Sequence, residues 1–274
     1  MNTGTVVDPL PVHDSGADPL PPGTIAINSD PRWRNPFDDA LPGAASTVAR
    51  AAALTHYAVW LAGRRELIDA RGELEGHHLA CSCPLGQPCH RDVLLDLADP
   101  DTITGRRHGR AVALTVRRPW ASLLLVPGAI GGKNIENRSW STEYRGALLI
   151  VAGTRVDQAG ILAAQRAGLD TAWHTRQHGW LGAAVLTDVH PATPRCCPPW
   201  GQAPSGNQPL YHWVFDHPAR LALPVHGTGF LGLRRAPWTK LIRAHALGLT
   251  GPNDGATATP SQTSSRPNLG GWRS

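Results

Sequence analysis

The chain contains very little lysine. Lys133 and Lys240 are the only lysines among 26 lysine and arginine residues, so arginine fills the other 24 positions. A basic position without a chemical requirement would therefore almost always be arginine. Lys133 indicates a requirement for a compact ammonium group, whose pKa can shift on burial, rather than for a guanidinium.

Long hydrophobic runs are also absent. The apolar segments ASLLLVPGAI and GALLIVAG are shorter than the ~18 residues that cross a bilayer, and the N-terminus lacks the basic start and apolar stretch of a signal peptide. We therefore expect no membrane partner. The five cysteines, an odd number, then favour a reducing, cytoplasmic location in which the thiols are free or bind metal.

Acidic residues are scarce in the second part of the chain. Residues 1–105 carry seven arginines and fourteen acidic residues, a net charge of −7, whereas residues 106–248 carry seventeen basic and six acidic residues, a net charge of +11. The remaining residues add +1, which gives the total of +5. This asymmetry favours a nucleic-acid or other polyanion surface on the second part. A solvated basic face without a partner is the alternative.

The composition predicts two domains. A lead rich in proline, aspartate and glycine, residues 1–23, and a tail, residues 249–274, have the composition of disordered segments. We expect a small α/β domain over residues 24–100, a linker over residues 101–110, where the charge changes sign, and a second domain over residues 111–248.

The spacing of apolar residues predicts the helices and strands of each domain, and their order predicts its fold class. Four elements are expected in the first domain, in the order strand, helix, strand and helix, at residues 24–28, 44–70, 78–83 and 90–98; Ser46 or Thr47 can cap the first helix. This order indicates an α/β layer. In the second domain, two helical segments at residues 119–126 and 155–169 interrupt six strand-like runs at residues 111–116, 135–140, 147–153, 179–189, 211–216 and 220–225. Many short strands with few helices predict a mainly β domain that forms a closed or nearly closed barrel.

A long proline-rich loop, residues 191–209, lies between two of these strands. Loops of this length are usually mobile or functional. We interpret its adjacent Cys196 and Cys197 as incidental.

The segment GGKNIENRSW, residues 131–140, concentrates charge. If it contains a strand, alternation places Asn134, Glu136 and Arg138 on one face, with Lys133 at the start of the strand. Two interpretations are open. The charges form a satisfied ion pair that closes one end of the barrel, or they line a polar pocket that hydrogen-bonds a base while arginine and lysine hold phosphate.

This segment, with ALTVRRPWASLL before it and YRGALLIVAG and YHWVFDHPARLALPVHGTGFLGL after it, resembles the ASCH domain over about residues 111–238. The ASCH motif G-x-K-x-x-E-x-R is filled by Gly131, Lys133, Glu136 and Arg138. The resemblance implies a PUA-like β-barrel with a cleft, lined by the motif, that binds RNA, DNA or a modified nucleoside.

The residues that the resemblance places in nucleic-acid binding, by motif position or by nearness in sequence, are Arg118, Trp120, Lys133, Glu136, Arg138, Tyr144 and Arg145. Trp120 could stack on a base or anchor the core at the start of a helix. An alternative function is hydrolysis, because some ASCH proteins are amidohydrolases of acetylcytidine and others are ribonucleases. Those amidohydrolases have threonine where this chain has Glu136, so the catalytic candidates here are Lys133 and Glu136, with the carboxylate as a base.

The segment LACSCPLGQPCHRDVLLDLAD, residues 79–99, places Cys81 and Cys83 on one face of a strand and Cys89 and His90 at the start of a helix. A helix N-terminus lowers the pKa of a thiol, so we expect reactive thiolate character at Cys89. The four residues are a candidate zinc site, although their spacing differs from the usual C-x-x-C pattern. Without a cofactor, the cysteines would simply pack a strand beneath a helix.

Together with WRNPF, residues 33–37, the cysteine segment resembles a bacterial and phage domain of unknown function, family DUF4326, over about residues 24–98. Members usually have glycine where this chain has Arg34, and the resemblance implies no reaction. Open α/β sheets bind ligands where strand ends face helix N-termini, so we expect an accessory role with a nucleotide or phosphate ligand. Asn35 and His90 are further candidate members of that site.

Overall fold

The computed structural model describes residues 9–38 and 46–249. Its N-terminal part contains a parallel sheet in the order β1-β3-β2, formed by β1 (Pro11–His13), β2 (Thr24–Ala26) and β3 (His78–Cys81). β2 and β3 lie within the two expected strands. β1 corrects the expectation that residues 1–23 form a disordered lead, because it pairs with β3. Residues 1–8, and the expected tail beyond residue 249, lie outside the described residues.

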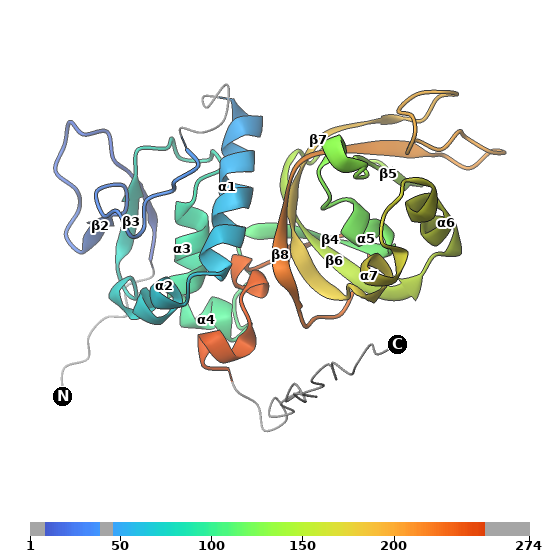
Figure 1. Cartoon of the computed structure of the whole chain (residues 1–274). Helices are drawn as coiled ribbons and strands as arrows, with labels where there is room; N and C mark the ends of the chain where they lie inside the picture. The colour runs from blue at the N-terminus through green and yellow to red at the C-terminus, as the bar shows by residue number, and fades with distance from the viewer. Residues whose placement is uncertain (1–8, 39–45, 250–274) are drawn as a thin grey trace, which may run out of the picture.

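Helices follow these strands along the chain. They are α1 (Thr47–Ala62), α2 (Arg65–Asp69), the 3₁₀ helix η1 (Ala70–Glu73), α3 (Arg91–Ala98) and α4 (Pro100–Ile103). α1 begins within the expected helix because Ser46 Oγ accepts the N–H of Ala49 at 3.1 Å. The helix is rich in alanine and buried along most of its length. It can therefore pack on two sides, and it lies between the N-terminal sheet and the C-terminal sheet (Figure 1).

The C-terminal part is built on a six-stranded sheet in the order β5-β8-β7-β6-β4-β9. Its strands are β4 (Ala111–Arg118), β5 (Ile135–Arg138), β6 (Gly146–Val156), β7 (Gly179–Pro191), β8 (Tyr211–Val225) and β9 (Leu233–Ala236). β4 and β6 pair in parallel, and the other neighbouring strands are antiparallel. All six predicted runs fall mainly within β4 to β8, two of them merged in β8, whereas β9 was not predicted.

The C-terminal sheet is curved (Figure 1) but open. Among the described residues, no ladder joins its edge strands β5 and β9, each of which pairs with one neighbour. The fold is therefore mixed α/β with an open six-stranded sheet, which corrects the expectation of barrel closure. The remaining helices are α5 (Trp120–Leu123), η2 (Gly128–Ile130), α6 (Gln158–Arg166), α7 (Thr171–Arg176), η3 (Trp238–Leu241) and η4 (Ala244–Leu247).

Two groups of buried side chains hold the molecule together. The larger group runs from Trp33 through α1 to Leu149 and Val185 on one face of the C-terminal sheet. The smaller group, which includes Leu148 and Trp213, lies with α5 residues on the other face. Neighbouring residues such as Leu148 and Leu149 separate in this way because side chains alternate along a strand. The N-terminal and C-terminal parts therefore share a hydrophobic core.

Asp96 joins the two parts through hydrogen bonds. Its fully buried carboxylate accepts the backbone N–H of Arg110 at 3.1 Å and that of Trp238 at 2.9 Å. The Arg110 guanidinium donates to the same carboxylate at 3.0 Å. The end of the expected linker is thus fixed against α3.

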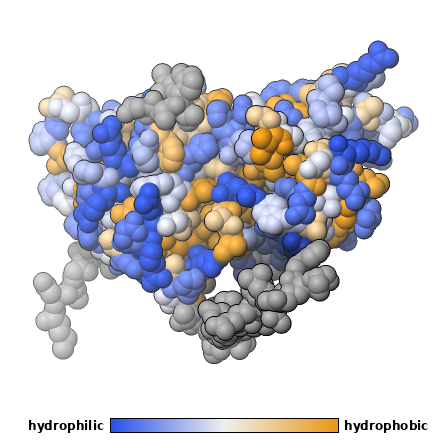
Figure 2. Space-filling view, in the orientation of Figure 1, coloured by the Kyte–Doolittle hydropathy of each residue, from blue (hydrophilic) through white to orange (hydrophobic). Residues whose placement is uncertain are grey.

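Most of the face seen in Figure 2 is hydrophilic, with groups of hydrophobic residues near the middle of the view and over the C-terminal part. Within the described ranges, every helix is too short or too polar to span a membrane.

Candidate functional site

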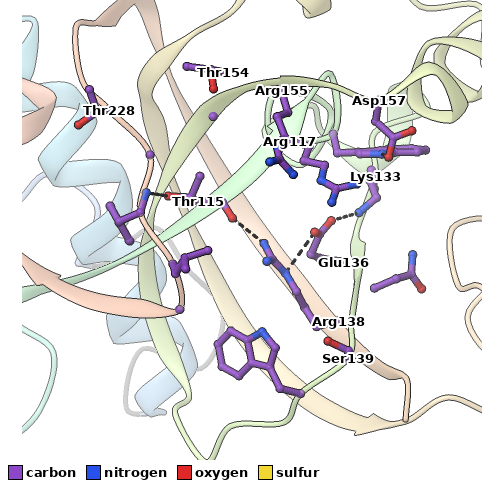
Figure 3. A pocket seen from close by; sticks show the side chains of 18 of the residues that line it. Thr115, Arg117, Lys133, Glu136, Arg138, Ser139, Thr154, Arg155, Asp157 and Thr228 are labelled. Atoms are coloured by element: carbon purple, nitrogen blue, oxygen red, sulfur yellow. Dashed lines mark hydrogen bonds and ion pairs between the residues drawn. The ribbon is translucent and has the colours of Figure 1, made fainter. Parts of the chain in front are cut away.

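A cavity of about 780 Å³ opens in the C-terminal part (Figure 3). β4, β5 and β6 supply most of its charged residues, and residues 228–232 supply a further part of its wall. The charged residues that line it are Arg117, Lys133, Glu136, Arg138, Arg155 and Asp157, and the aromatic ones are Trp120, Trp140 and Phe230.

Lys133 follows a tight turn whose two glycines are required by the backbone. Gly131 has a φ of +86°, in the left-handed region that favours glycine. A Cβ atom on Gly132 would lie 1.8 Å from the carbonyl oxygen of Val126. The N–H of Lys133 then donates to Leu123 O at 3.0 Å. The turn therefore fixes where β5 begins and where the lysine side chain starts.

Lys133, Glu136 and Arg138 form a row of alternating charge. Lys133 Nζ donates to Glu136 Oε2 at 2.5 Å, and Arg138 Nε lies 3.3 Å from Glu136 Oε1. Arg138 also donates to Thr115 O at 2.7 Å. The lysine side chain is only 2% exposed, so burial lowers the pKa of its ammonium while the Glu136 carboxylate opposes that shift. Glu136 and Arg138 share one face, as alternation predicted, whereas Asn134 is exposed and does not line the cavity.

Arg117 on β4 and Arg155 on β6 are exposed and extend toward this row (Figure 3). In the described part of the chain, neither guanidinium has a hydrogen-bond or ion-pair partner. The four basic side chains of the cavity, against the carboxylates of Glu136 and Asp157, leave a net charge of +2. Neither arginine was predicted from the sequence, because only the parallel pairing of β4 with β6 brings the two together.

Trp120 is held in place on several sides. Its Nε1 donates to Asp157 Oδ2 at 3.0 Å, and Lys133 Nζ lies 5.3 Å from the centroid of its ring. A Cβ atom on Gly160 would lie 2.8 Å from the ring, so α6 packs closely against it. These contacts support the interpretation of Trp120 as an anchor that also forms part of the cavity wall.

Trp140 and Phe230 are partly exposed aromatic residues of the same cavity. Trp140 packs edge-on against Trp213, with ring centroids 4.6 Å apart. The N–H of Phe230 donates to Thr115 Oγ1 at 2.9 Å, which ties the segment of residues 228–232 to β4. Their rings offer apolar surface beside the charged row.

Three predicted nucleic-acid-binding residues lie outside the lining of this cavity. Arg118 donates from its guanidinium to two backbone carbonyl groups. The Tyr144 hydroxyl donates to Ala147 O at 2.7 Å, and Tyr144 and Arg145 line a second cavity of about 470 Å³. Nearness in sequence therefore did not predict nearness to Lys133.

In the N-terminal part, the sulfur atoms of Cys81, Cys83 and Cys89 all lie within 4.8 Å of one another. Three thiols at this separation could hold a metal ion. His90, the fourth predicted ligand, is not part of the group. Its Nδ1 lies 4.0 Å from Cys89 Sγ and 3.8 Å from a carboxylate oxygen of Asp38. Zinc at these three thiols stays a prediction.

The expectation of thiolate character at Cys89 is reversed by its neighbours. Hydrogen bonds from the thiols of Cys83 and Cys89 stabilise a Cys81 thiolate and hold the pKa of Cys81 well below its usual range. Interaction with Cys81 and Cys83, together with burial, raises the pKa of Cys89. Within this group, the directions of the pKa shifts favour a thiolate at Cys81, on β3, over one at Cys89, next to α3.

Asn35 and His90 lie on either side of Asp38. Asn35 Nδ2 donates to Asp38 Oδ1 at 2.6 Å, and Asn35 Oδ1 accepts the N–H of Phe37 at 2.9 Å. Both Asn35 and His90 are buried. Asp38 therefore links the WRNPF segment to the histidine beside the thiols.

Comparison with known proteins bears on this N-terminal part. No curated protein matches the chain. Residues 12–100 match the family model described as Domain of unknown function (DUF4326). The matched range contains Asn35, His90 and the three clustered thiols. The likeness to DUF4326 that the cysteine segment predicted is thus confirmed for residues 12–100 of the chain.

Proposed function

We propose that residues 111–248 are an ASCH domain with a PUA-like fold and that its cavity binds one nucleotide of a nucleic-acid strand. The observation that carries the proposal is the pair Arg117 and Arg155. Two guanidinium groups without partners in the described chain extend into a cavity that already contains a buried row of charge. A modified nucleoside presented by such a strand fits the same cavity.

The two arginines suit a phosphate group. A guanidinium offers several N–H donors in a fixed plane, and hydrogen bonds between ionised groups are the stronger kind. Because Arg117 and Arg155 are exposed, they can bind a phosphate without breaking an existing ion pair. The net charge of +2 of the lining residues favours an anion in the cavity.

The rest of the cavity suits a base. Phe230 and Trp140 offer partly exposed rings on which a base can stack. Glu136 offers carboxylate lone pairs to the N–H groups of a base, and Arg138 holds that carboxylate in place. The volume of about 780 Å³ falls within the range of roughly 300 to 1,000 Å³ that is usual for small-ligand sites.

The contacts of Glu136 favour a role in binding a nucleotide over the alternative role in hydrolysing acetylcytidine. One of its oxygens accepts from Lys133 at 2.5 Å and the other lies 3.3 Å from Arg138. A carboxylate whose two oxygens both face cations is poorly placed to take a proton from a substrate or a water molecule. We therefore assign Lys133 and Glu136 to recognition, with acetylcytidine hydrolysis as the activity to be tested against this assignment.

The test measures fluorescence anisotropy of labelled single-stranded RNA, single-stranded DNA and duplex DNA. It compares the wild type with an Arg117→Ala/Arg155→Ala variant and with Arg166→Ala, which removes an exposed arginine of α6 outside the cavity. We expect the double variant to bind at least tenfold more weakly and Arg166→Ala to bind like the wild type. Equal affinity of all three proteins, or hydrolysis of acetylcytidine by the wild type, would contradict the proposal.

A further inference from the structure

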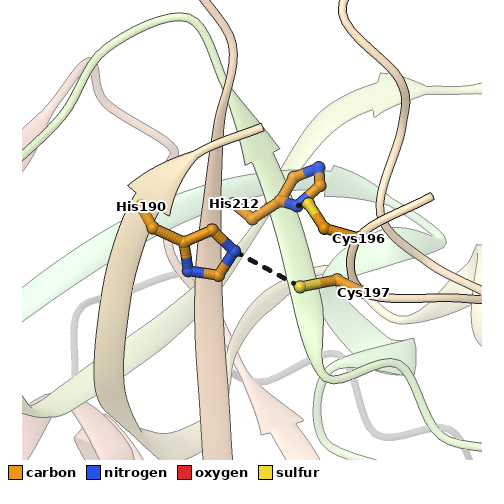
Figure 4. Close-up of side chains that lie close together, drawn as sticks. All are labelled: His190, Cys196, Cys197 and His212. Carbon is orange, nitrogen blue, oxygen red and sulfur yellow. Dashed lines mark hydrogen bonds between the residues drawn. The ribbon is translucent and has the colours of Figure 1, made fainter. Parts of the chain in front are cut away.

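A second cluster of metal-ligating side chains lies outside the nucleotide cavity. His190, Cys196, Cys197 and His212 each bring one ligand atom to within 4.8 Å of the others (Figure 4). This arrangement corrects the interpretation of Cys196 and Cys197 as incidental. Two imidazoles and two thiols from separate segments of the chain therefore lie close enough to share one metal ion.

The β7–β8 ladder and the loop between the two strands build this cluster. His190 near the end of β7 and His212 near the start of β8 are direct partners in the antiparallel register. Cys196 and Cys197 come from the connecting loop, residues 192–210. The loop folds back so that Cys196 Sγ lies 3.0 Å from His212 Nδ1 and Cys197 Sγ lies 3.4 Å from His190 Nε2. Tetrahedral zinc with usual bond lengths separates sulfur and nitrogen ligands by about 3.5 Å.

Each histidine has a second partner on its other ring nitrogen. His190 faces Cys197 through Nε2, and its Nδ1 lies 2.7 Å from Asp188 Oδ2. His212 faces Cys196 through Nδ1, and its Nε2 lies 2.9 Å from the backbone carbonyl oxygen of a loop residue, Gln202. Metal-bound histidines usually donate their free N–H to a carboxylate or a backbone carbonyl, which fixes the tautomer and the orientation of the ring. Both histidines have that arrangement.

We propose that His190, Cys196, Cys197 and His212 bind one zinc ion in a closed, tetrahedral structural site. Thiolate and imidazole ligands suit zinc, and four protein ligands leave no position for a substrate. The N–H of Thr193 also donates to Cys196 Sγ at 3.3 Å, which stabilises a thiolate. Binding replaces the two thiol protons with the metal and releases them to solvent.

The site connects to the nucleotide cavity through the loop. Trp200 Nε1 donates to Gly132 O at 3.0 Å, and Asn137 Nδ2 donates to Trp200 O at 3.0 Å. The N–H of Gln202 donates to Asn137 Oδ1 at 2.9 Å, and Gln202 lines the cavity. Zinc at the base of the loop therefore holds Trp200 and Gln202 in place beside the turn that carries Lys133. The zinc site itself does not depend on what the cavity binds.

The first test measures zinc per chain by elemental analysis of the purified full-length protein under reducing conditions. It compares the wild type, a Cys196→Ser/Cys197→Ser variant and a Cys81→Ser/Cys83→Ser/Cys89→Ser variant. We expect the Cys196→Ser/Cys197→Ser variant to contain one zinc fewer per chain than the wild type, whether or not the N-terminal thiols also bind metal. We expect the triple variant to retain that one zinc. Equal zinc content in the wild type and the Cys196→Ser/Cys197→Ser variant would overturn the proposal.

The second test keeps all four ligands and so does not depend on the folding of a cysteine variant. The wild type, stripped of metal by a chelator, is titrated with Co²⁺ and then with Zn²⁺. We expect thiolate-to-cobalt charge-transfer absorption and the intense visible bands of a tetrahedral site, which zinc then removes. Asp188→Asn is expected to bind the metal about 10- to 100-fold more weakly, because His190 loses its carboxylate partner. Absence of these bands in the wild type would overturn the proposal, as would unchanged affinity in Asp188→Asn.

Discussion

Arg117 and Arg155 stand on β4 and β6, two strands that pair in parallel, and both guanidinium groups reach the same cavity. Neither has a partner within the described residues, whereas Arg138 in the same cavity is bound to Thr115 O and lies beside Glu136. The cavity thus contains two cations that Glu136 holds, Lys133 and Arg138, and two exposed arginines that can contact a ligand. This division leads to different expectations for substitutions at the two kinds of position.

The charged row should respond asymmetrically to loss of its members. Glu136→Ala leaves the Lys133 ammonium buried without its carboxylate, and breaking a buried pair in this way costs about 3–5 kcal/mol. Lys133→Met should cost less, because Glu136 keeps Arg138 as a partner. Urea denaturation measures both free energies of unfolding, with Arg155→Ala as an exposed control expected within about 0.5 kcal/mol of the wild type. A greater loss for Lys133→Met than for Glu136→Ala would contradict this account of the row.

In the turn before Lys133, position 132 should accept only glycine. Gly132→Ala places a Cβ atom 1.8 Å from a backbone carbonyl oxygen, so we expect a loss of at least about 1–3 kcal/mol in the free energy of unfolding. Gly128→Ala, four residues earlier, is the matched control because no atom lies within 4 Å of its Cβ position. Thermal unfolding of the two variants gives the comparison, and equal midpoints would show that the turn is not constrained.

Phe230 should contribute stacking to a bound base. Phe230→Ala is expected to weaken binding of single-stranded RNA by about 1–3 kcal/mol, which is roughly 5- to 150-fold in the dissociation constant. Phe230→Tyr retains the ring and should bind like the wild type. The same anisotropy titration with a strand that lacks a base at the bound position separates stacking from phosphate contacts. A loss of affinity that persists with this strand would assign Phe230 another role.

The stability of the junction between the two parts should depend on pH through Asp96. Burial raises the pKa of its carboxyl group to about 6 despite hydrogen bonds from Trp238 and Arg110. Since the folded protein then holds this proton more tightly than the unfolded chain, the stabilising contribution of the protonated group is complete below about pH 4 and is lost as the pH rises to about 6.

Asp96→Asn removes this titration. The free energy of unfolding of the wild type, relative to that of the variant, should fall by about 2–3 kcal/mol over this pH interval. Urea denaturation of both proteins at several pH values gives the two curves. Parallel curves would show that Asp96 does not titrate in this interval.

Local patterns in the sequence predicted local structure well. Ser46 capped α1 as expected, and alternation along β5 placed Glu136 and Arg138 on a shared face. Strand β1 escaped prediction because Pro11–His13 is three residues long and is a strand only through its pairing with β3. The sequence pattern carries no information about such a partner.

The site residues that were missed depend on register between strands. Arg117 meets Arg155 through the β4–β6 pairing, and His190 faces His212 across the β7–β8 ladder. Strand β5 and its connections lie between Arg117 and Arg155 in the sequence, and the loop of residues 192–210 lies between His190 and His212, so spacing gave no signal for either pair. Tyr144 was a candidate through its nearness in sequence to the G-x-K-x-x-E-x-R motif, and it lines the second cavity rather than the one that contains Lys133.

If Arg117 and Arg155 contact a phosphate of a bound strand, their removal must change the salt dependence of that binding. Affinity for single-stranded RNA is measured by anisotropy over a series of salt concentrations for the wild type, Arg117→Ala/Arg155→Ala and Arg166→Ala. Each phosphate contact in a single strand contributes about 0.7 to the slope of log affinity against log salt concentration. Because the two arginines share one phosphate, we expect a slope that is shallower by about 0.7 in the double variant and unchanged in Arg166→Ala. Identical slopes in all three proteins would contradict it.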